Sequence, residues 1–139
     1  MSTINSKLRE AFREIGDEAT IQNSIRKVVL KFYEKMSTDI MLGFFFTGKD
    51  LDRIAYQQAH FLLRAAGISS TYQGKTPAKA HSAIPPILQG HFDRRLVILK
   101  EVLEEAGFNE NIVTAWVSFE NSFRKSIVEA EAPISKRKK

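Results

Sequence analysis

Apolar residues recur along most of the chain at the three- and four-residue intervals of an amphipathic helix. Between residues 18 and 36, one such stripe contains Ile21, Ile25, Val28, Val29, Phe32 and Met36. Similar stripes predict helices over about 8–15, 51–66, 88–106 and 110–129. The alternating pattern and turn dipeptides of β-hairpins are missing, so the sequence predicts an all-α fold.

Several of the predicted helices have recognisable ends. Asp17 precedes the first long helix and Asn109 precedes the last, and both residue types commonly cap helix N-termini. Gly67 and Gly107 follow two of the other helices, as expected for C-terminal stops. The uninterrupted apolar run 96–99 predicts a helix that is covered on every side.

Two stretches lack helical periodicity. Residues 67–88 are interrupted by glycine, serine and proline and leave room for one short helical segment near 78–82. Residues 136–139 are all basic, follow Pro133, and should be disordered. Because no internal repeat or interdomain linker is visible, we expect a single domain over 1–131 and a basic disordered tail over 132–139.

The composition narrows the possible chemistry. The 139 residues include no cysteine, which excludes thiolate catalysis, disulfides and Cys-based metal sites and leaves three histidines as nitrogen ligands. The formal charge of +5 falls to +1 without residues 136–139, so we expect no nucleic acid partner. No signal peptide or membrane-length apolar run is visible. We therefore expect a cytoplasmic protein that binds no membrane.

Two polar side chains fall on stripes that are predicted to be buried. Tyr33 lies next to Phe32 near the end of the first long stripe, and Gln58 lies at the centre of the apolar face of the next helix. A buried polar group needs a hydrogen-bond partner. Either both groups serve a site that binds a polar ligand, or each bonds to a neighbouring carbonyl.

The three histidines differ in their surroundings. His81 lies in the loop-rich stretch; it is either solvated or, given the polar pair and the three phenylalanines at 44–46, an axial ligand of a haem iron. Those phenylalanines either plug the core at a corner or wall a cavity. His60 lies about 200° around its helix from Gln58 and is expected on the surface. His91 begins a helix, where capping is the expected role.

Several short motifs occur in the order and spacing found in truncated haemoglobins. They are Ile15-Gly16, Phe32-Tyr33, Phe45-Phe46-Thr47-Gly48, Gln57-Gln58 with Phe61, Tyr72-x-Gly74, Ala80-His81 and His91-Phe92-Asp93. Together they extend over about residues 15–128, and the sequence most resembles the first group of this family. The resemblance implies a two-on-two helical sandwich around a haem b.

The resemblance also implies a role for each matching residue. His81 would be the proximal iron ligand, and Phe46 would pack flat against the haem. Tyr33, supported by Gln58, would donate a hydrogen bond to bound dioxygen. The other expected haem contacts are Phe32, Phe45, Ile54, Phe61, Leu62 and Tyr72, with Ile54 above the open iron position and Tyr72 near the haem edge.

The function implied by the resemblance is reversible binding of dioxygen, with nitric oxide or carbon monoxide as further ligands. Nitric oxide dioxygenation with a reductase partner, ligand sensing, and oxygen storage or transport all use one pocket. Enzymatic activity therefore stays open, as does the oligomeric state. The alternative is a haem-free helical interaction module whose basic tail finds an acidic partner.

The sequence departs from the family pattern at several positions. Pro77 stands where a methionine is common, and Pro85-Pro86 stiffen the loop that follows the expected iron ligand. Arg95 occupies a position that is usually apolar, and it either reaches a haem propionate or marks a one-residue slip in the alignment. The paired glycines usual before the first long helix are reduced to Gly16.

Overall fold

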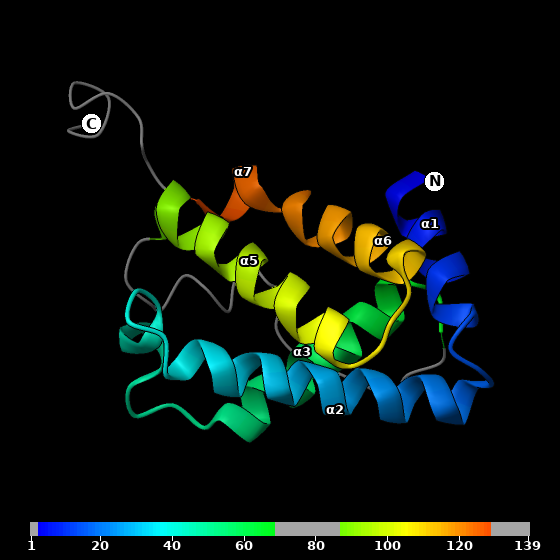
Figure 1. The fold of residues 1–139 in the computed structure, drawn as a ribbon, viewed down its shortest axis with the longest axis horizontal. Coiled ribbons are helices and arrows are strands. Elements are labelled where there is room, and N and C mark those ends of the chain that lie inside the picture. The colour runs from blue at the N-terminus through cyan, green and yellow to red at the C-terminus, as the bar shows by residue number, and fades with distance from the viewer. Residues whose placement is uncertain (1–2, 69–86, 129–139) are drawn as a thin grey trace.

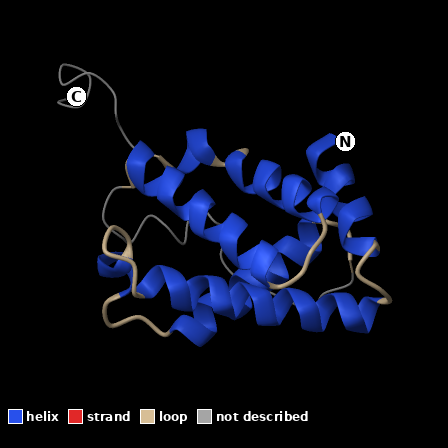
Figure 2. Cartoon of the chain, viewed as in Figure 1, coloured by secondary structure: helices blue, strands red, loops and turns tan. Residues whose placement is uncertain are grey.

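The computed structural model describes residues 3–68 and 87–128. Its elements are α1 (Thr3–Arg13), α2 (Glu18–Ser37), the 3₁₀ helix η1 (Gly43–Phe46), α3 (Leu51–Ala65), α5 (Gln89–Glu105), α6 (Glu110–Asn121) and α7 (Arg124–Ile127). Within these ranges the one β-type pairing is an isolated parallel bridge between Ile87 and Val128, and Figure 2 shows helices and loops without a strand. The prediction of an all-α fold is confirmed.

The helices form two stacked pairs (Figure 1). α2 packs along α3, α5 packs along α6, and contacts between α2 and α5 join the two pairs, while α1 lies against α6. This is the two-on-two arrangement expected from the sequence. In the part of the chain that the structure describes, every helix is too short or too polar to span a bilayer.

Local signals in the sequence fix where the helices begin and end. Asp17 accepts a hydrogen bond from the backbone N–H of Thr20 at 2.8 Å, and Asn109 accepts one from Ile112 at 3.0 Å. Gly107 follows α5 with a φ of 87°, a left-handed conformation that glycine adopts without strain. The predicted caps and this predicted stop are confirmed.

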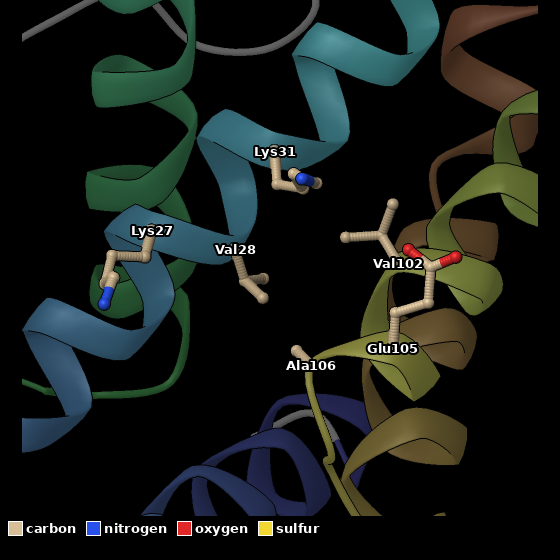
Figure 3. A pocket seen from close by; sticks show the side chains of 6 residues that line it. All are labelled: Lys27, Val28, Lys31, Val102, Glu105 and Ala106. Atoms are coloured by element: carbon tan, nitrogen blue, oxygen red, sulfur yellow. The ribbon is translucent and has the colours of Figure 1, made fainter.

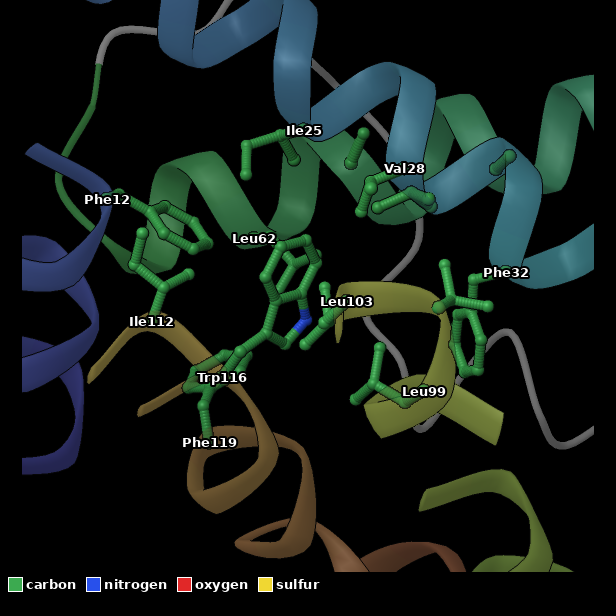
Figure 4. Close-up of a cluster of buried hydrophobic side chains, with 14 of the residues drawn as sticks. Phe12, Ile25, Val28, Phe32, Leu62, Leu99, Leu103, Ile112, Trp116 and Phe119 are labelled. Carbon is green, nitrogen blue, oxygen red and sulfur yellow. The ribbon is translucent and has the colours of Figure 1, made fainter. Parts of the chain in front are cut away.

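The hydrophobic core lies where the two helix pairs meet. Trp116 of α6 is fully buried, and Phe12 of α1 packs edge-on against it with ring centroids 5.2 Å apart. Figure 4 shows side chains from α1, α2, α3, α5 and α6 converging on this cluster: Phe12, Ile25, Val28, Phe32, Leu62, Leu99, Leu103, Ile112, Trp116 and Phe119. Burying each large side chain contributes roughly 1.5–3 kcal/mol, so the cluster holds the two pairs together.

Two details of the sequence prediction are wrong. The helix expected over 110–129 is broken, because α6 ends at Asn121 and α7 begins at Arg124. Ser122 follows α6 and donates its hydroxyl to the carbonyl of Phe119 at 2.6 Å, a bond that competes with helical continuation. The apolar run 96–99 is not covered on every side, since Val97 is 47% exposed. α5 therefore has one face open to solvent.

Candidate functional site

An aromatic corner, formed by the three phenylalanines of η1, connects α2 to α3. Phe45 is buried and packs edge-on against His91 of α5, with ring centroids 5.0 Å apart. Phe46 is half-buried and meets the ring of Tyr33 at 5.7 Å in a T-shaped contact. Phe44 is 51% exposed. One phenylalanine thus plugs the core, the next faces Tyr33, and the third lies at the surface.

Asp39 holds this corner in place. One carboxylate oxygen accepts hydrogen bonds from the backbone N–H groups of Met41 at 3.0 Å and Leu42 at 3.2 Å. The other accepts a bond from the Nε of Arg94 on α5 at 2.9 Å. Hydrogen bonding from Arg94 is the largest reason why the pKa of Asp39 lies below its ordinary value, and the two backbone bonds add to it. The corner is therefore tied to α5 by a charged contact.

Tyr33 projects from α2 into the interior and is 6% exposed. Its ring contacts Phe32 at a centroid distance of 5.4 Å as well as Phe46 of the aromatic corner. Burial raises the pKa of the Tyr33 phenol above its ordinary value, and the positive charge of Arg95 and a hydrogen bond with that residue oppose the rise. The phenol stays protonated at neutral pH and keeps its O–H group.

Gln58 reaches from α3 to α6. Its amide Nε2 donates a hydrogen bond to Oε2 of Glu120 at 3.2 Å. Glu120 is only 4% exposed, and carboxylates are buried to this extent almost only when they are paired. The polar side chain on the α3 stripe thus bonds to a buried carboxylate, not to the neighbouring backbone carbonyl that the sequence left as one possibility.

Arg95 of α5 supplies the positive charge for this carboxylate. Its guanidinium forms an ion pair with Glu120 and lies 5.0 Å from the centroid of the Phe32 ring. Burial acts to lower the pKa of Arg95, but the negative charge of Glu120, together with hydrogen bonding to Glu120 and Tyr33, outweighs this effect, so the pKa is raised. Arg95 is therefore charged and directed to an internal carboxylate, a partner that neither sequence-based alternative named.

The sequence reasoning missed Glu120, although a signal for it exists. Glu120 follows Ile112 by eight residues and Trp116 by four, so helical periodicity places it on the buried stripe of α6. A carboxylate on a buried stripe implies a cationic partner. Arg95, which directly precedes the apolar run of α5, is this cationic partner.

The other residues expected on α3 form an apolar surface on the same helix as Gln58. Leu62 is fully buried, and Ile54 is half-buried and packs against the core cluster. Phe61 is half-buried, with its ring centroid 6.0 Å from that of Phe119 and 5.6 Å from that of Phe123. α3 thus presents apolar side chains on either side of one half-buried amide.

Some of the expected features lie outside the described residues: His81, Tyr72, the short segment 78–82 and the tail 132–139. Among the described histidines, His91 accepts a hydrogen bond from the backbone N–H of Leu88 through Nδ1 at 3.0 Å, so its predicted capping role is confirmed. Over residues 3–68 and 87–128, no group of three histidine, aspartate or glutamate side chains is arranged to hold a metal ion.

The prediction that His60 lies on the surface is wrong, because this side chain is only 3% exposed. Its ring packs against that of Tyr56 at 4.3 Å, and the guanidinium of Arg26 on α2 lies 5.9 Å from the Tyr56 ring. The face of α3 turned away from Gln58 is thus covered by α2. Burial lowers the pKa of His60, and the charge of Arg26 lowers it further.

A separate pocket of about 240 Å³ opens between α2 and α5 (Figure 3). It is lined by Lys27, Val28, Lys31, Val102, Glu105 and Ala106. Pockets for small molecules usually exceed about 300 Å³ and are mostly apolar. This one is smaller, is half lined by charged residues and contains none of the expected site residues, so it is not the candidate site.

Two stacked helix pairs, an aromatic corner, a buried phenol on α2 and a half-buried amide on α3 define a globin of the short, two-on-two class. The chain belongs to the bacterial-like globin family, whose model matches residues 10–128. Membership of this family implies a haem cofactor and the binding of diatomic gases. Its relatives place the chain among the group I truncated globins.

The comparisons agree on this placement. A group 1 truncated haemoglobin from Tetrahymena pyriformis is 29% identical over 109 residues, which are 78% of this chain and 85% of the relative. A second, from Tetrahymena thermophila, is 28% identical over 73% of this chain and 80% of its own length. The crystal structure of the Tetrahymena pyriformis protein in its Fe(III) form superimposes with a TM-score of 0.73 at 25% identity, covering 88% of this chain and 98% of that one.

Proposed function

We propose that this globin binds haem b through His81 and reversibly binds dioxygen beneath Tyr33 and Gln58. The observation that carries the proposal is a buried phenol on α2 and a half-buried amide on α3, both set among aromatic and aliphatic residues. A plain helical core has no use for either group. A pocket for a partly charged diatomic ligand needs such donors.

The residues of the chain fit a haem. In globins the protein supplies one proximal histidine to the haem iron, so the site requires no cluster of acidic and histidine ligands, and none is found in the described ranges. A flat apolar macrocycle requires aromatic and aliphatic contacts, which Phe46 and Phe61 would supply. His81 would hold the iron, and its neutral imidazole would be oriented through its other ring nitrogen.

Substituted forms of the Tetrahymena pyriformis protein support the roles of Tyr33 and Gln58. One crystal structure has a tyrosine replaced by phenylalanine, and another has a glutamine, 25 positions further along, replaced by glutamate. Tyr33 and Gln58 are separated by the same 25 positions. A third structure replaces a glutamine four positions before the other, where this chain has Ile54. This chain would therefore use one amide where the relative has two.

When bound, the haem supplies an iron centre to which a diatomic gas can attach. The chain then determines how long the gas stays. Dioxygen in this position carries partial negative charge, so O–H and N–H groups of Tyr33 and Gln58 would hold it by about 1.5–3 kcal/mol. Carbon monoxide is less polar when bound and gains less. Apolar neighbours such as Phe32 exclude water and strengthen these bonds.

The same pocket would also serve a more specific activity, either the dioxygenation of nitric oxide or gas sensing. Tyr33 and Gln58 would hold the dioxygen, the haem would supply the electron that converts dioxygen and nitric oxide into nitrate, and a reductase partner would restore the reduced protein. We propose this dioxygenation, or sensing of the same gases, in the cytoplasm. Turnover of nitric oxide by the reduced protein in the presence of dioxygen measures the first activity directly. Nitrate formed in no more than the uncatalysed amount would leave sensing or storage.

One absorbance spectrum tests the haem proposal. We expect the purified chain, reconstituted with haem b, to show an intense haem band that shifts when the reduced protein is exposed to dioxygen or carbon monoxide. A chain that retains no haem after gel filtration would instead be the haem-free interaction module. The spectrum should be unchanged in a variant that lacks residues 136–139, because the tail is not expected to contribute to the pocket.

A further inference from the structure

The ion pair between Arg95 and Glu120 joins α5 to α6 and is largely buried, with the side chain of Glu120 6% exposed and that of Arg95 17% exposed. Removing two charges from water costs much of what their attraction returns, so a buried pair is weak evidence for stabilisation. The Phe32 ring, 5.0 Å from the guanidinium, offers a further favourable contact for the cation. We therefore expect the ion pair to have a role other than stabilising the fold.

The ion pair lies next to both polar residues proposed to hold dioxygen. Glu120 uses one oxygen for Arg95 and the other for the amide of Gln58, at 3.2 Å. The Arg95 guanidinium lies 5.0 Å from the centroid of the Phe32 ring, which is itself 5.4 Å from that of Tyr33, and its charge acts on the Tyr33 phenol. Four polar side chains from four helices are thus grouped around one ion pair: Gln58, Glu120, Arg95 and Tyr33.

The chemistry of these groups limits what each can donate or accept. A guanidinium can only donate, so a hydrogen bond from Arg95 to Tyr33 would use the phenol oxygen and leave the phenol hydrogen for another acceptor. A carboxylate can only accept, so Glu120 selects the amide orientation in which Nε2 of Gln58 faces it. That bond uses one of the two hydrogens on Nε2. The phenol hydrogen of Tyr33 and the second amide hydrogen of Gln58 can therefore be donated to a ligand.

We propose that Arg95 and Glu120 are positioning residues that hold Tyr33 and Gln58 as hydrogen-bond donors toward the ligand. The inference rests on the proposed function, because it assigns how the dioxygen site is oriented. It also makes the pair a determinant of specificity. A ligand that accepts hydrogen bonds, such as dioxygen, benefits from fixed donors, whereas carbon monoxide benefits little.

The test compares Arg95→Met with Lys35→Met in the haem-loaded protein. Lys35 lies on α2 and pairs with the exposed Glu105, so its replacement removes one charge and one ion pair outside this group of four residues. We expect Arg95→Met to release dioxygen about fivefold faster, since a neutral hydrogen bond contributes about 1 kcal/mol. Carbon monoxide release should hardly change, and Lys35→Met should behave as wild type.

Two further measurements separate positioning from a loss of structure. Arg95→Met introduced into Tyr33→Phe should add little to the faster release, because the two residues act through one hydroxyl. In ring-labelled protein, the pKa of Tyr33 followed by NMR should rise in Arg95→Met and not in Lys35→Met, with Tyr33→Phe identifying the signal. If Arg95→Met does not fold, Glu120→Gln decides, because it keeps the volume, removes the charge and should also release dioxygen faster.

The outcomes are distinct. The inference is overturned if Tyr33→Phe speeds dioxygen release while Arg95→Met and Glu120→Gln release it as slowly as Lys35→Met. If the loaded protein forms but Tyr33→Phe releases dioxygen at the wild-type rate, the proposed distal site is wrong and the inference fails with it. A chain that binds no haem overturns both at the first step.

Discussion

Gln58 and Glu120, which are 62 positions apart in the sequence, share a hydrogen bond of 3.2 Å inside the protein. The bond joins α3, which belongs to one helix pair, to α6, which belongs to the other. Because the Glu120 carboxylate is buried, this hydrogen bond is stable only while Arg95 balances the charge of Glu120. The stability of the fold and the geometry of the site therefore depend on the same residue.

Glu120→Ala should destabilise the protein by about 3 kcal/mol, because it leaves the Arg95 guanidinium buried without a counterion. The double variant Arg95→Met with Glu120→Met should recover much of this loss, since it removes both charges at similar volume. Urea unfolding followed by circular dichroism measures both. A double variant less stable than Glu120→Ala would show that the pair contributes strongly to stability on its own.

Tyr33→Phe should speed the release of dioxygen about ten- to a hundredfold, because a hydrogen bond to a partly charged ligand contributes about 1.5–3 kcal/mol. The rate of association should change far less. Stopped-flow displacement of dioxygen by carbon monoxide gives the release rate. An unchanged release rate in a variant with wild-type thermal stability would mean that Tyr33 does not face the ligand.

His81→Ala should prevent stable retention of haem, because the chain would lose its proposed iron ligand. His91→Asn is the matched control, since it removes a histidine and keeps a side-chain acceptor for the N–H of Leu88. Absorbance after gel filtration compares the two. Equal haem content in both variants would require a different proximal ligand.

Asp39 makes stability depend on pH in the acid range. Because Arg94 and the two backbone donors lower the pKa of folded Asp39 below its ordinary value of 3.8, its contribution is complete above about pH 4 and is lost as the pH falls through the folded value. Asp39→Asn keeps an acceptor for the backbone and should lose about 1 kcal/mol at neutral pH.

The free energy of unfolding, measured from pH 6 down to pH 2.5, checks this assignment. The wild type should lose its advantage over Asp39→Asn as the pH falls. A difference that stays constant to the lowest pH would assign the acid sensitivity to other carboxylates. Lys35→Met, which breaks an exposed ion pair with Glu105, should leave the profile nearly unchanged.

The sequence predicted the helices well where one apolar stripe and a cap agree. α2 begins after Asp17 as expected and ends at Ser37, one residue beyond the expected end. The break before α7 was missed because it depends on whether one hydroxyl, that of Ser122, bonds back to the chain. His60 was misplaced because periodicity assumes that one helix face is covered, whereas α3 is covered by both α2 and α6.

The candidate site was predictable in part. Tyr33 and Gln58 stand out as polar residues on apolar stripes, which is a local signal that one sequence contains. The contact between Arg95 and Glu120 is not local, since the two residues are 25 positions apart and lie on different helices. Each residue alone stands out as a charged side chain on or beside an apolar stripe. Helical periodicity, however, does not say which helices lie close enough for the two side chains to meet. The pairing therefore required the structure.

The neighbours Arg94 and Arg95 bind partners on different sides of α5, one at the aromatic corner and one in the interior. Successive residues of a helix are about 100° apart, so the two ion pairs together fix the rotation of α5 about its own axis. Inserting or deleting one residue between Arg95 and the buried stripe that begins at Ile98 would rotate both guanidinium groups out of register with the packed part of α5. Homologues that keep these four residues should therefore vary in length outside α5 and not within its first turns.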